Sequence, residues 1–171
     1  MFSSIQINRK FWINLICFIL GVLLLFYLII KYRVAPTLSF ADLKLTTLAS
    51  TPAPLSDYKE KVIVLNFWKT WCGTCLGEMP SIDKAQALSD TSKIVFILVS
   101  DEGLDKISTF KTKHVYSFQY LVSNKSFSEL GINTYPTTYI IDKNGKVAYT
   151  QIGSINWSSK EIVDLLKDLS Q

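Results

Sequence analysis

Hydrophobic and polar positions divide the chain into one uninterrupted apolar segment and a longer region of alternating patterns. Residues 11–30 (FWINLICFILGVLLLFYLII) contain no charged residue. They are apolar on all sides, unlike a core helix with its single apolar stripe. A helix of this length would span about 30 Å, the thickness of a bilayer core. The pattern predicts a transmembrane anchor at 11–30 that contacts membrane lipid, after a short tail at 1–10 and before a linker at 31–41.

A cleaved signal peptide is the alternative interpretation of this segment. Signal peptides usually have a shorter apolar region, followed by small residues at the cleavage site. Here the apolar run is followed by Lys31, Tyr32 and Arg33. Basic residues lie on both sides of the run, so the positive-inside rule does not orient it. The free amino terminus favours an orientation with the N-terminus inside and the C-terminal region outside.

Residues 42–171 alternate between segments typical of strands and segments typical of helices. Strand patterns cover residues 43–48, 62–68, 93–100, 118–122, 137–141 and 146–151. Helical patterns cover residues 72–89, 104–113 and 158–169, with a short helical turn at 126–130. Asn144-Gly145 predicts a hairpin turn, and Ser158 with Glu161 predicts a capping box for the last helix. This order predicts an α/β fold with a mixed central sheet flanked by helices.

The composition is that of a folded domain behind a basic N-terminal segment. Hydrophobic residues make up 49% of the chain and charged residues 19%, which excludes a disordered protein. Three cysteines exclude a disulfide-dense mini-scaffold. Residues 36–171 carry 14 lysines, no arginine and 14 acidic residues. This balance argues against a nucleic-acid partner, which needs a clustered basic surface. Nothing in the sequence demands an oligomer, so we expect a monomer.

The candidate chemistry lies where a buried strand runs into a helix. Cys72 and Cys75 follow the strand at 62–68 and open the helix at 72–89. The unpaired N–H groups and the dipole at the start of a helix stabilise an anion, so a thiolate is favoured there. Two intervening residues allow the second cysteine to reach the first and close a disulfide. A Cys-x-x-Cys pair in this context indicates redox chemistry.

The motifs around this pair resemble those of the membrane-anchored TlpA/ResA/DsbE group of thioredoxin-like proteins. Residues 66–75 (NFWKTWCGTC) and 78–80 (EMP) match the redox-helix signature of the group. Residues 135–142 (YPTTYIID) and 145–147 (GKV) resemble its proline, strand and hairpin signature. The similarity extends from about residue 40 to the C-terminus, and an N-terminal anchor is usual in the group. The resemblance implies a thioredoxin-like fold over 42–171 and thiol–disulfide oxidoreductase activity.

The resemblance also implies roles for individual residues. Cys72 would be the attacking thiolate and Cys75 the buried resolving thiol, so that Cys72 and Cys75 form the redox disulfide. Pro136 would be a cis proline facing the disulfide, which leaves the Tyr135 backbone free to pair with an extended substrate. Glu78 lies one helical turn after Cys75 and would take part in proton transfer during exchange.

The resemblance also bears on the cover of the dithiol, the subgroup and the direction of electron flow. Trp71 would pack beside the dithiol and cover it. Asn66 stands where ordinary thioredoxins carry a buried acid, which shifts the acid–base role towards Glu78. The dipeptide Gly73-Thr74 tunes the redox potential, and it lacks the histidine that helps make some family members strong oxidants. We therefore expect a reductant or an isomerase rather than a strong oxidant.

The resulting functional hypothesis is a reductant of protein disulfides at the cell (inner) membrane. The catalytic domain would be extracytoplasmic or periplasmic, because disulfides persist outside the cytosol. Its substrates would be cysteine-containing exported proteins, including the haem-binding cysteines of apocytochromes in cytochrome c biogenesis. A membrane thiol donor would supply electrons, and no cofactor or metal is needed.

Two other functions stay open from the sequence. Cys72 and Cys75 could hold Cu(I) in a metal-binding module, because thiolates suit this soft ion. Zinc would require four ligands, and beyond this pair only the distant His114 is available. A peroxide-reducing relative is the third interpretation, although peroxidatic sites do not normally carry the Trp-Cys-x-x-Cys element.

Overall fold

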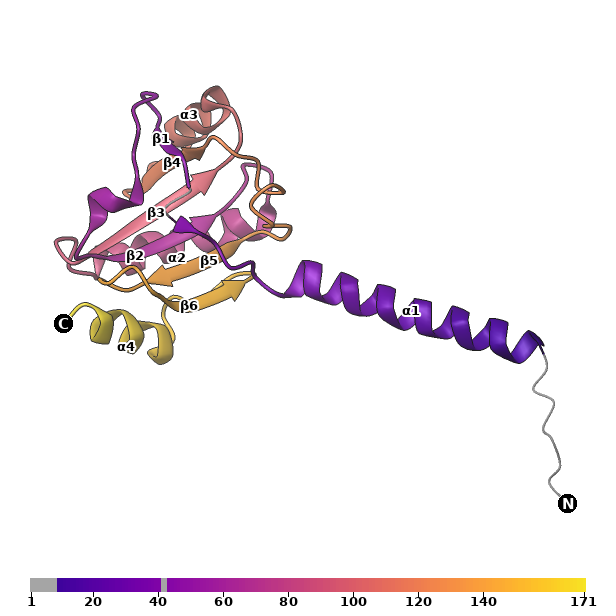
Figure 1. The fold of residues 1–171 in the computed structure, drawn as a ribbon. Coiled ribbons are helices and arrows are strands. Elements are labelled where there is room, and N and C mark those ends of the chain that lie inside the picture. The colour runs from indigo at the N-terminus through magenta and orange to yellow at the C-terminus, as the bar shows by residue number, and fades with distance from the viewer. Residues whose placement is uncertain (1–8, 41–42) are drawn as a thin grey trace, which may run out of the picture. The chain divides into compact units, whose positions relative to one another are not determined.

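A computed structural model of the chain describes residues 9–40 and 43–171, in two compact units divided between Val34 and Ala35 (Figure 1). The first unit contains helix α1 (Arg9–Arg33). Among the described residues, α1 is the helix that is long and apolar enough to cross a membrane. It extends beyond the predicted 11–30 at both ends. Residues 1–8 of the predicted tail at 1–10, and the predicted start of the second domain at 42, lie outside the described residues, while Arg9 and Lys10 belong to α1.

The second unit is built on one mixed sheet with the strand order β1-β4-β3-β2-β5-β6. The strands are β1 (Leu45–Thr47), β2 (Val62–Phe67), β3 (Ile94–Ser100), β4 (Gln119–Ser123), β5 (Thr137–Ile141) and β6 (Val147–Ile152). The helices are η2 (Leu55–Tyr58), α2 (Gly73–Ala87), α3 (Leu104–Lys113) and α4 (Lys160–Leu169). Strands β2, β3 and β4 are parallel, whereas β1, β5 and β6 each run antiparallel to a neighbour.

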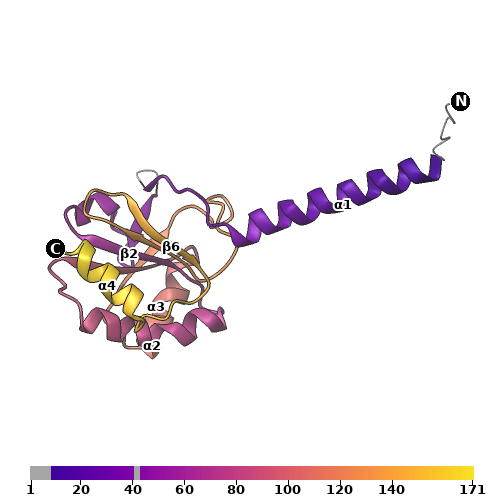
Figure 2. The ribbon, with the colours of Figure 1, turned by 90° about the horizontal axis from the view of Figure 1, so that it is seen from below.

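Alternation along the central strand β2 separates two hydrophobic cores. Val62 and Val64 belong to the core that α2, α3 and α4 cover, and these helices lie on the same side of the sheet (Figure 2). Ile63, Leu65 and Phe67, which alternate with these valines along β2, face a second core. The segments around Leu55 and Phe127 cover that second core. The mixed sheet flanked by helices confirms the predicted thioredoxin-like α/β fold. Every residue of β2 is buried, as the apolar pattern of this strand predicts.

The ends of two elements show how well local sequence signals locate boundaries. The predicted hairpin turn connects β5 and β6, and Gly145 adopts a positive φ of 78° there. The prediction that Ser158 caps the last helix was wrong by one residue. Ser159 is the N-cap of α4, and its hydroxyl accepts the N–H of Ile162. The hydroxyl of Ser158 instead donates to the Asn156 side chain.

Candidate active site

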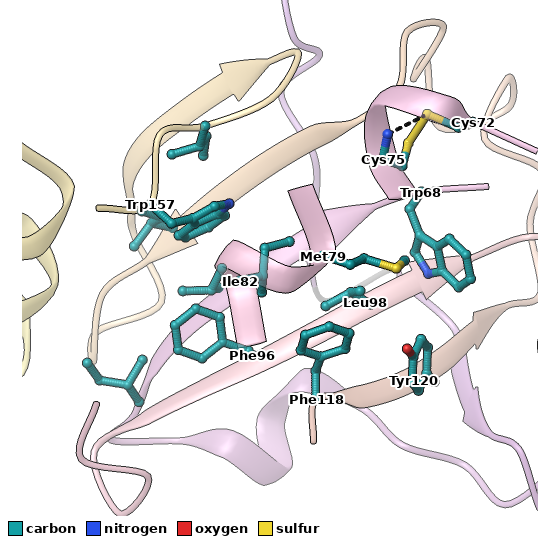
Figure 3. Close-up of a cluster of buried hydrophobic side chains, with 14 of the residues drawn as sticks. Trp68, Cys72, Cys75, Met79, Ile82, Phe96, Leu98, Phe118, Tyr120 and Trp157 are labelled. Carbon is teal, nitrogen blue, oxygen red and sulfur yellow. Dashed lines mark hydrogen bonds between the residues drawn. A yellow bond between two sulfur atoms is a disulfide. The ribbon is translucent and has the colours of Figure 1, made fainter. Parts of the chain in front are cut away.

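The cysteine pair lies at the start of α2, immediately after the end of β2. Cys72 is the N-cap of α2 and forms a disulfide with Cys75. The Cys75 N–H also donates to Cys72 Sγ at 3.1 Å, shown as the dashed line in Figure 3. Cys72 retains 7% of its surface exposed, while Cys75 retains 1%. Cys72 is therefore the more accessible sulfur, and the N-cap position favours its thiolate when the disulfide is reduced.

A buried tryptophan forms the floor of the site. Trp68 follows β2 directly and is fully buried, and its backbone N–H donates to the Val99 carbonyl. Figure 3 shows its ring beneath the disulfide-bearing end of α2, near Met79 and Tyr120. The ring centroids of Trp68 and Tyr120 lie 5.8 Å apart. Trp68 is therefore a core residue at the point where the chain turns from β2 into the redox helix.

Asn66 and Glu78 meet between the sheet and α2. Asn66 lies on the helix-covered face of β2, in register with Thr138 of β5. Its side-chain amide donates to Glu78 Oε1 and to Thr138 Oγ1, each at 2.9 Å. The second Glu78 oxygen accepts the backbone N–H of Ile155 at 3.1 Å. Within residues 9–40 and 43–171, the carboxylate makes no hydrogen bond to either cysteine.

The environment of Glu78 favours its protonated form. The side chain retains only 5% of its surface exposed. Burial raises the pKa of Glu78, because the charged form loses its hydration. The hydrogen bonds from Ile155 and Asn66 oppose this effect without cancelling it. A carboxyl group with a raised pKa can exchange protons closer to neutral pH, as a proton acceptor beside a thiol must.

The predicted proline loop lies between the site and β5. The Tyr135–Pro136 peptide bond is cis, and the Pro136 carbonyl accepts the N–H of Gly153 at 2.8 Å. In the part of the chain that the structure describes, the backbone N–H and C=O of Tyr135 make no hydrogen bond. The Tyr135 ring meets the ring of Trp71 edge-on at 6.0 Å. Trp71 retains 67% of its surface exposed, so most of its ring is open to solvent.

The first turn of α2 presents Gly73 and Thr74 to solvent. Both therefore lie on the exposed side of the disulfide. Among the described residues, no group of three or more histidine, cysteine or acidic side chains is placed to hold a metal ion. The site therefore combines the Cys72–Cys75 pair with the buried carboxyl group of Glu78, which lies one helical turn after Cys75 in α2.

Two acidic residues at the end of β3 hold the loop before the redox helix, and the sequence analysis did not single them out. Asp101 forms an ion pair with Lys69. Glu102 accepts the Thr70 N–H at 2.6 Å and the Thr70 hydroxyl at 2.9 Å. Asp101 and Glu102 follow a buried strand that is parallel to β2, so both strands end at the same edge of the sheet. The sequence could have predicted that Asp101 and Glu102 lie near the cysteines, because the ends of two parallel strands meet at this edge.

This fold and this site define a thiol–disulfide oxidoreductase of the thioredoxin-like class. A model of the redoxin family matches residues 33–166, and the chain belongs to that family. The thioredoxin-like protein YneN of Bacillus subtilis is 30% identical over 125 residues, covering 70% of this chain and 73% of YneN. The thiol-disulfide oxidoreductase ResA of Geobacillus thermodenitrificans is 30% identical over 120 residues, covering 68% of this chain and 69% of ResA.

Solved structures show the same fold. The exposed lipoprotein thioredoxin of Streptococcus pneumoniae matches with a TM-score of 0.63 and 29% identity, covering 75% of this chain and all of that one (100%). A Chlorobium tepidum protein described as a thiol:disulfide interchange protein DsbE matches with a TM-score of 0.68. It is 20% identical, and the match covers 80% of this chain and 99% of that one. The second likeness concerns the fold alone.

Proposed function

We propose that the protein is a membrane-anchored, extracytoplasmic reductant of protein disulfides. One observation carries the proposal. The N-cap cysteine of α2 is joined to a more deeply buried cysteine, and a buried carboxyl group lies one turn further along the same helix. An accessible nucleophile, a protected resolving thiol and a proton acceptor are the three groups that reduction by a dithiol requires.

The first step is attack by the reduced pair on a substrate disulfide. The Cys72 thiolate attacks one sulfur of the substrate, and the substrate disulfide breaks as the enzyme–substrate disulfide forms. The other substrate sulfur leaves as a thiolate and takes up a proton from water. The N-cap position supports this role, because the first turn of α2 stabilises the Cys72 thiolate before attack.

The second step releases the substrate. Cys75 loses its proton and attacks Cys72, so that the Cys72–Cys75 disulfide forms and the second substrate sulfur leaves as a thiol. Both electrons that reduce the substrate come from the two enzyme sulfurs. Glu78 is the proposed proton acceptor for Cys75, because it lies three residues further along α2 and its pKa is raised by burial.

The proline loop is the proposed binding element for the substrate chain. The N–H and C=O of Tyr135, which have no partner among the described residues, can pair with an extended polypeptide in the manner of an added strand. Trp71, Gly73 and Thr74 border the same edge of the disulfide and are exposed. A substrate that pairs with Tyr135 would present its own disulfide to Cys72.

The proposed location follows from α1 and from the chemistry. Helix α1 would anchor the protein in the cell membrane, with the N-terminus inside and the redox domain outside. Disulfides persist in that compartment, so exported cysteine-containing proteins are the proposed substrates, among them apocytochromes. A membrane thiol protein would return electrons to the Cys72–Cys75 disulfide after each turnover.

The reduction potential of the pair tests the direction of electron flow. The full-length chain, in detergent, is equilibrated with thiol buffers of graded potential, and the fraction of Cys72–Cys75 disulfide is measured by alkylation. A potential near that of thioredoxin, about −270 mV, supports the reductant. A potential near that of the oxidant DsbA, about −120 mV, would make the protein a disulfide donor or an isomerase instead.

A reporter fusion tests the location. Alkaline phosphatase is active only where its own disulfides form, outside the cytosol. Fused after Gln171, it should be active in whole cells. An inactive fusion, expressed at the same level as an active exported control, would refute the proposed orientation.

A further inference from the structure

A lysine occupies an unusual place between β2 and the redox helix. Only 14% of the Lys69 side chain is exposed, although it carries a charge. Its ammonium group forms an ion pair with Asp101, whose side chain is 9% exposed. The same ammonium group lies 4.9 Å from the ring centroid of Phe127 and 5.6 Å from that of Tyr135. Lysine is rarely buried to this extent without a paired charge, so the ion pair and the two rings explain its position.

We propose that Lys69 is a positioning residue for substrate binding, which holds the Tyr135 ring, and through it Trp71, beside the disulfide. The proposal deepens the proposed function. It rests on exchange by the Cys72–Cys75 pair, and it holds for either direction of electron flow.

The backbone of Lys69 connects it directly to the redox helix. Its carbonyl accepts the N–H of Cys72 at 3.1 Å. The side chain of the same residue reaches Tyr135, which precedes the cis proline. One residue therefore contacts both halves of the active site, the loop that carries the nucleophile and the loop that would bind the substrate.

Asp101 anchors the charged end of this connection. One of its oxygens pairs with Lys69, and the other accepts the Phe127 N–H at 2.7 Å. The Phe127 ring packs against the Tyr135 ring with centroids 5.6 Å apart. Tyr135 is thus held on one side by Phe127 and on another by the Lys69 ammonium group.

Trp71 and Tyr135 form the outer end of this connection from Asp101 through Lys69, and we call this pair of rings the aromatic edge. The Trp71 ring meets Tyr135 at 84° between ring planes and is otherwise largely exposed. Because Asp101 neutralises Lys69, this edge presents aromatic surface rather than net charge. It therefore suits an extended polypeptide with apolar side chains next to its disulfide cysteine.

Two disulfide probes separate substrate binding from thiol chemistry. One is a short peptide with leucine on either side of a cysteine that carries a thionitrobenzoate group as a mixed disulfide. The other is dithiobis-nitrobenzoate, which has the same leaving group and no peptide. Reduced full-length protein in detergent is mixed with each probe, and thionitrobenzoate release gives the maximal rate and the half-saturating concentration.

The central variant is Lys69→Met, which retains an unbranched apolar side chain and removes the charge. In this variant we expect the half-saturating peptide concentration to rise about five- to tenfold more than the half-saturating concentration of dithiobis-nitrobenzoate. The reason is that the cation–π contacts of the ammonium group with the Phe127 and Tyr135 rings are lost. Lys69→Arg should restore peptide binding, since a guanidinium group also pairs with a carboxylate and stacks on rings. Lys160→Met is the matched control, because it removes an exposed ion pair on α4 and should leave both probes unaffected.

The outcomes that overturn the proposal are specific. An unchanged half-saturating peptide concentration in Lys69→Met would refute it, as would equal losses with both probes, which would indicate disturbed thiol chemistry. If Lys69→Met fails to fold, the double variant Lys69→Met/Asp101→Asn leaves no unpaired buried carboxylate and should show the same rise. Wild-type binding by that folded double variant would also refute the proposal. Failure of the reductant assignment would appear separately, in the reduction potential of the wild-type protein.

Discussion

The buried carboxyl group of Glu78 gives the molecule a pH dependence that one substitution can isolate. Its raised pKa means that the folded protein keeps this proton at pH values where the unfolded chain has released it. Folding therefore takes up a proton in a window that opens near the ordinary value of 4.5 and closes at the raised value. Below this window the contribution of Glu78 to stability is fully present, and it is lost as the pH rises through the window.

Glu78→Gln removes the titration but not the shape of the side chain. The carboxylate accepts two hydrogen bonds, from Asn66 and from the Ile155 N–H, on different oxygens. A glutamine has one oxygen for these two donors, so one buried donor loses its partner, which costs about 1–3 kcal/mol. This cost does not depend on pH. The titration of wild-type Glu78 changes the free energy of unfolding by at most about 1.4 kcal/mol per pH unit within the window.

The assay is urea denaturation of the oxidised full-length protein in detergent, at a series of pH values from acid to mildly alkaline. In the oxidised protein Cys72 and Cys75 are joined and do not titrate. Glu78→Gln should be less stable than wild type at acid pH, and the difference should shrink as the pH rises. All other carboxyl groups cancel in this difference. A difference that is constant or that grows with pH would refute the assignment of a raised pKa to Glu78.

Exchange kinetics give the same substitution a second readout. If Glu78 accepts the proton of Cys75, Glu78→Gln should slow the release of substrate. It should also move the rise in rate to higher pH, because Cys75 must then lose its proton to solvent. An unchanged pH–rate profile would show that Glu78 does not take part in the exchange.

Three further predictions concern the cysteines and the packing around them. Cys72→Ser should abolish exchange, whereas Cys75→Ser should accumulate an enzyme–substrate disulfide visible on a non-reducing gel. Full turnover by Cys75→Ser would show that the assigned roles are wrong. Met79 retains 1% of its surface exposed, so Met79→Ala should leave a cavity and lower the free energy of unfolding by about 2–5 kcal/mol in urea denaturation. A loss below this range would show that the cavity collapses. Ser159→Ala should cost about 0.5–2 kcal/mol of stability, while Ser158→Ala should change it by less than about 0.5 kcal/mol; equal losses would contradict the assigned N-cap of α4.

Local patterns in the sequence were sufficient for the elements and for the reactive pair. The apolar run of β2, the spacing of α4 and the turn before β6 each depend on neighbours along the chain, so their periods are readable without a structure. The position of Cys72 and Cys75 at the start of a helix is local in the same sense. The one-residue error at Ser158 arose because adjacent serines give the same capping signal, and the structure separates them by their partners, Ile162 for Ser159 and Asn156 for Ser158.

The surroundings of the pair were decided by the tertiary structure. Glu78 was recognisable as a residue one turn after Cys75, but its pKa depends on its burial and on hydrogen bonds from Asn66 in β2 and from Ile155 after β6. Its burial could not be read from the helix, because the strands that cover it are distant in sequence.

The Lys69 contacts make the same distinction more sharply. In the sequence, Lys69 is one of 18 basic residues, and nothing local separates it from an exposed lysine. Its partners Asp101, Phe127 and Tyr135 lie far along the chain, and parallel pairing of β2 with β3 brings Asp101 to the same edge of the sheet. The sequence by itself determined the chemistry of the cysteine pair and the order of the elements, because both follow from local spacing. The charges and rings placed around that pair depended on contacts across the sheet, which only the tertiary structure specifies.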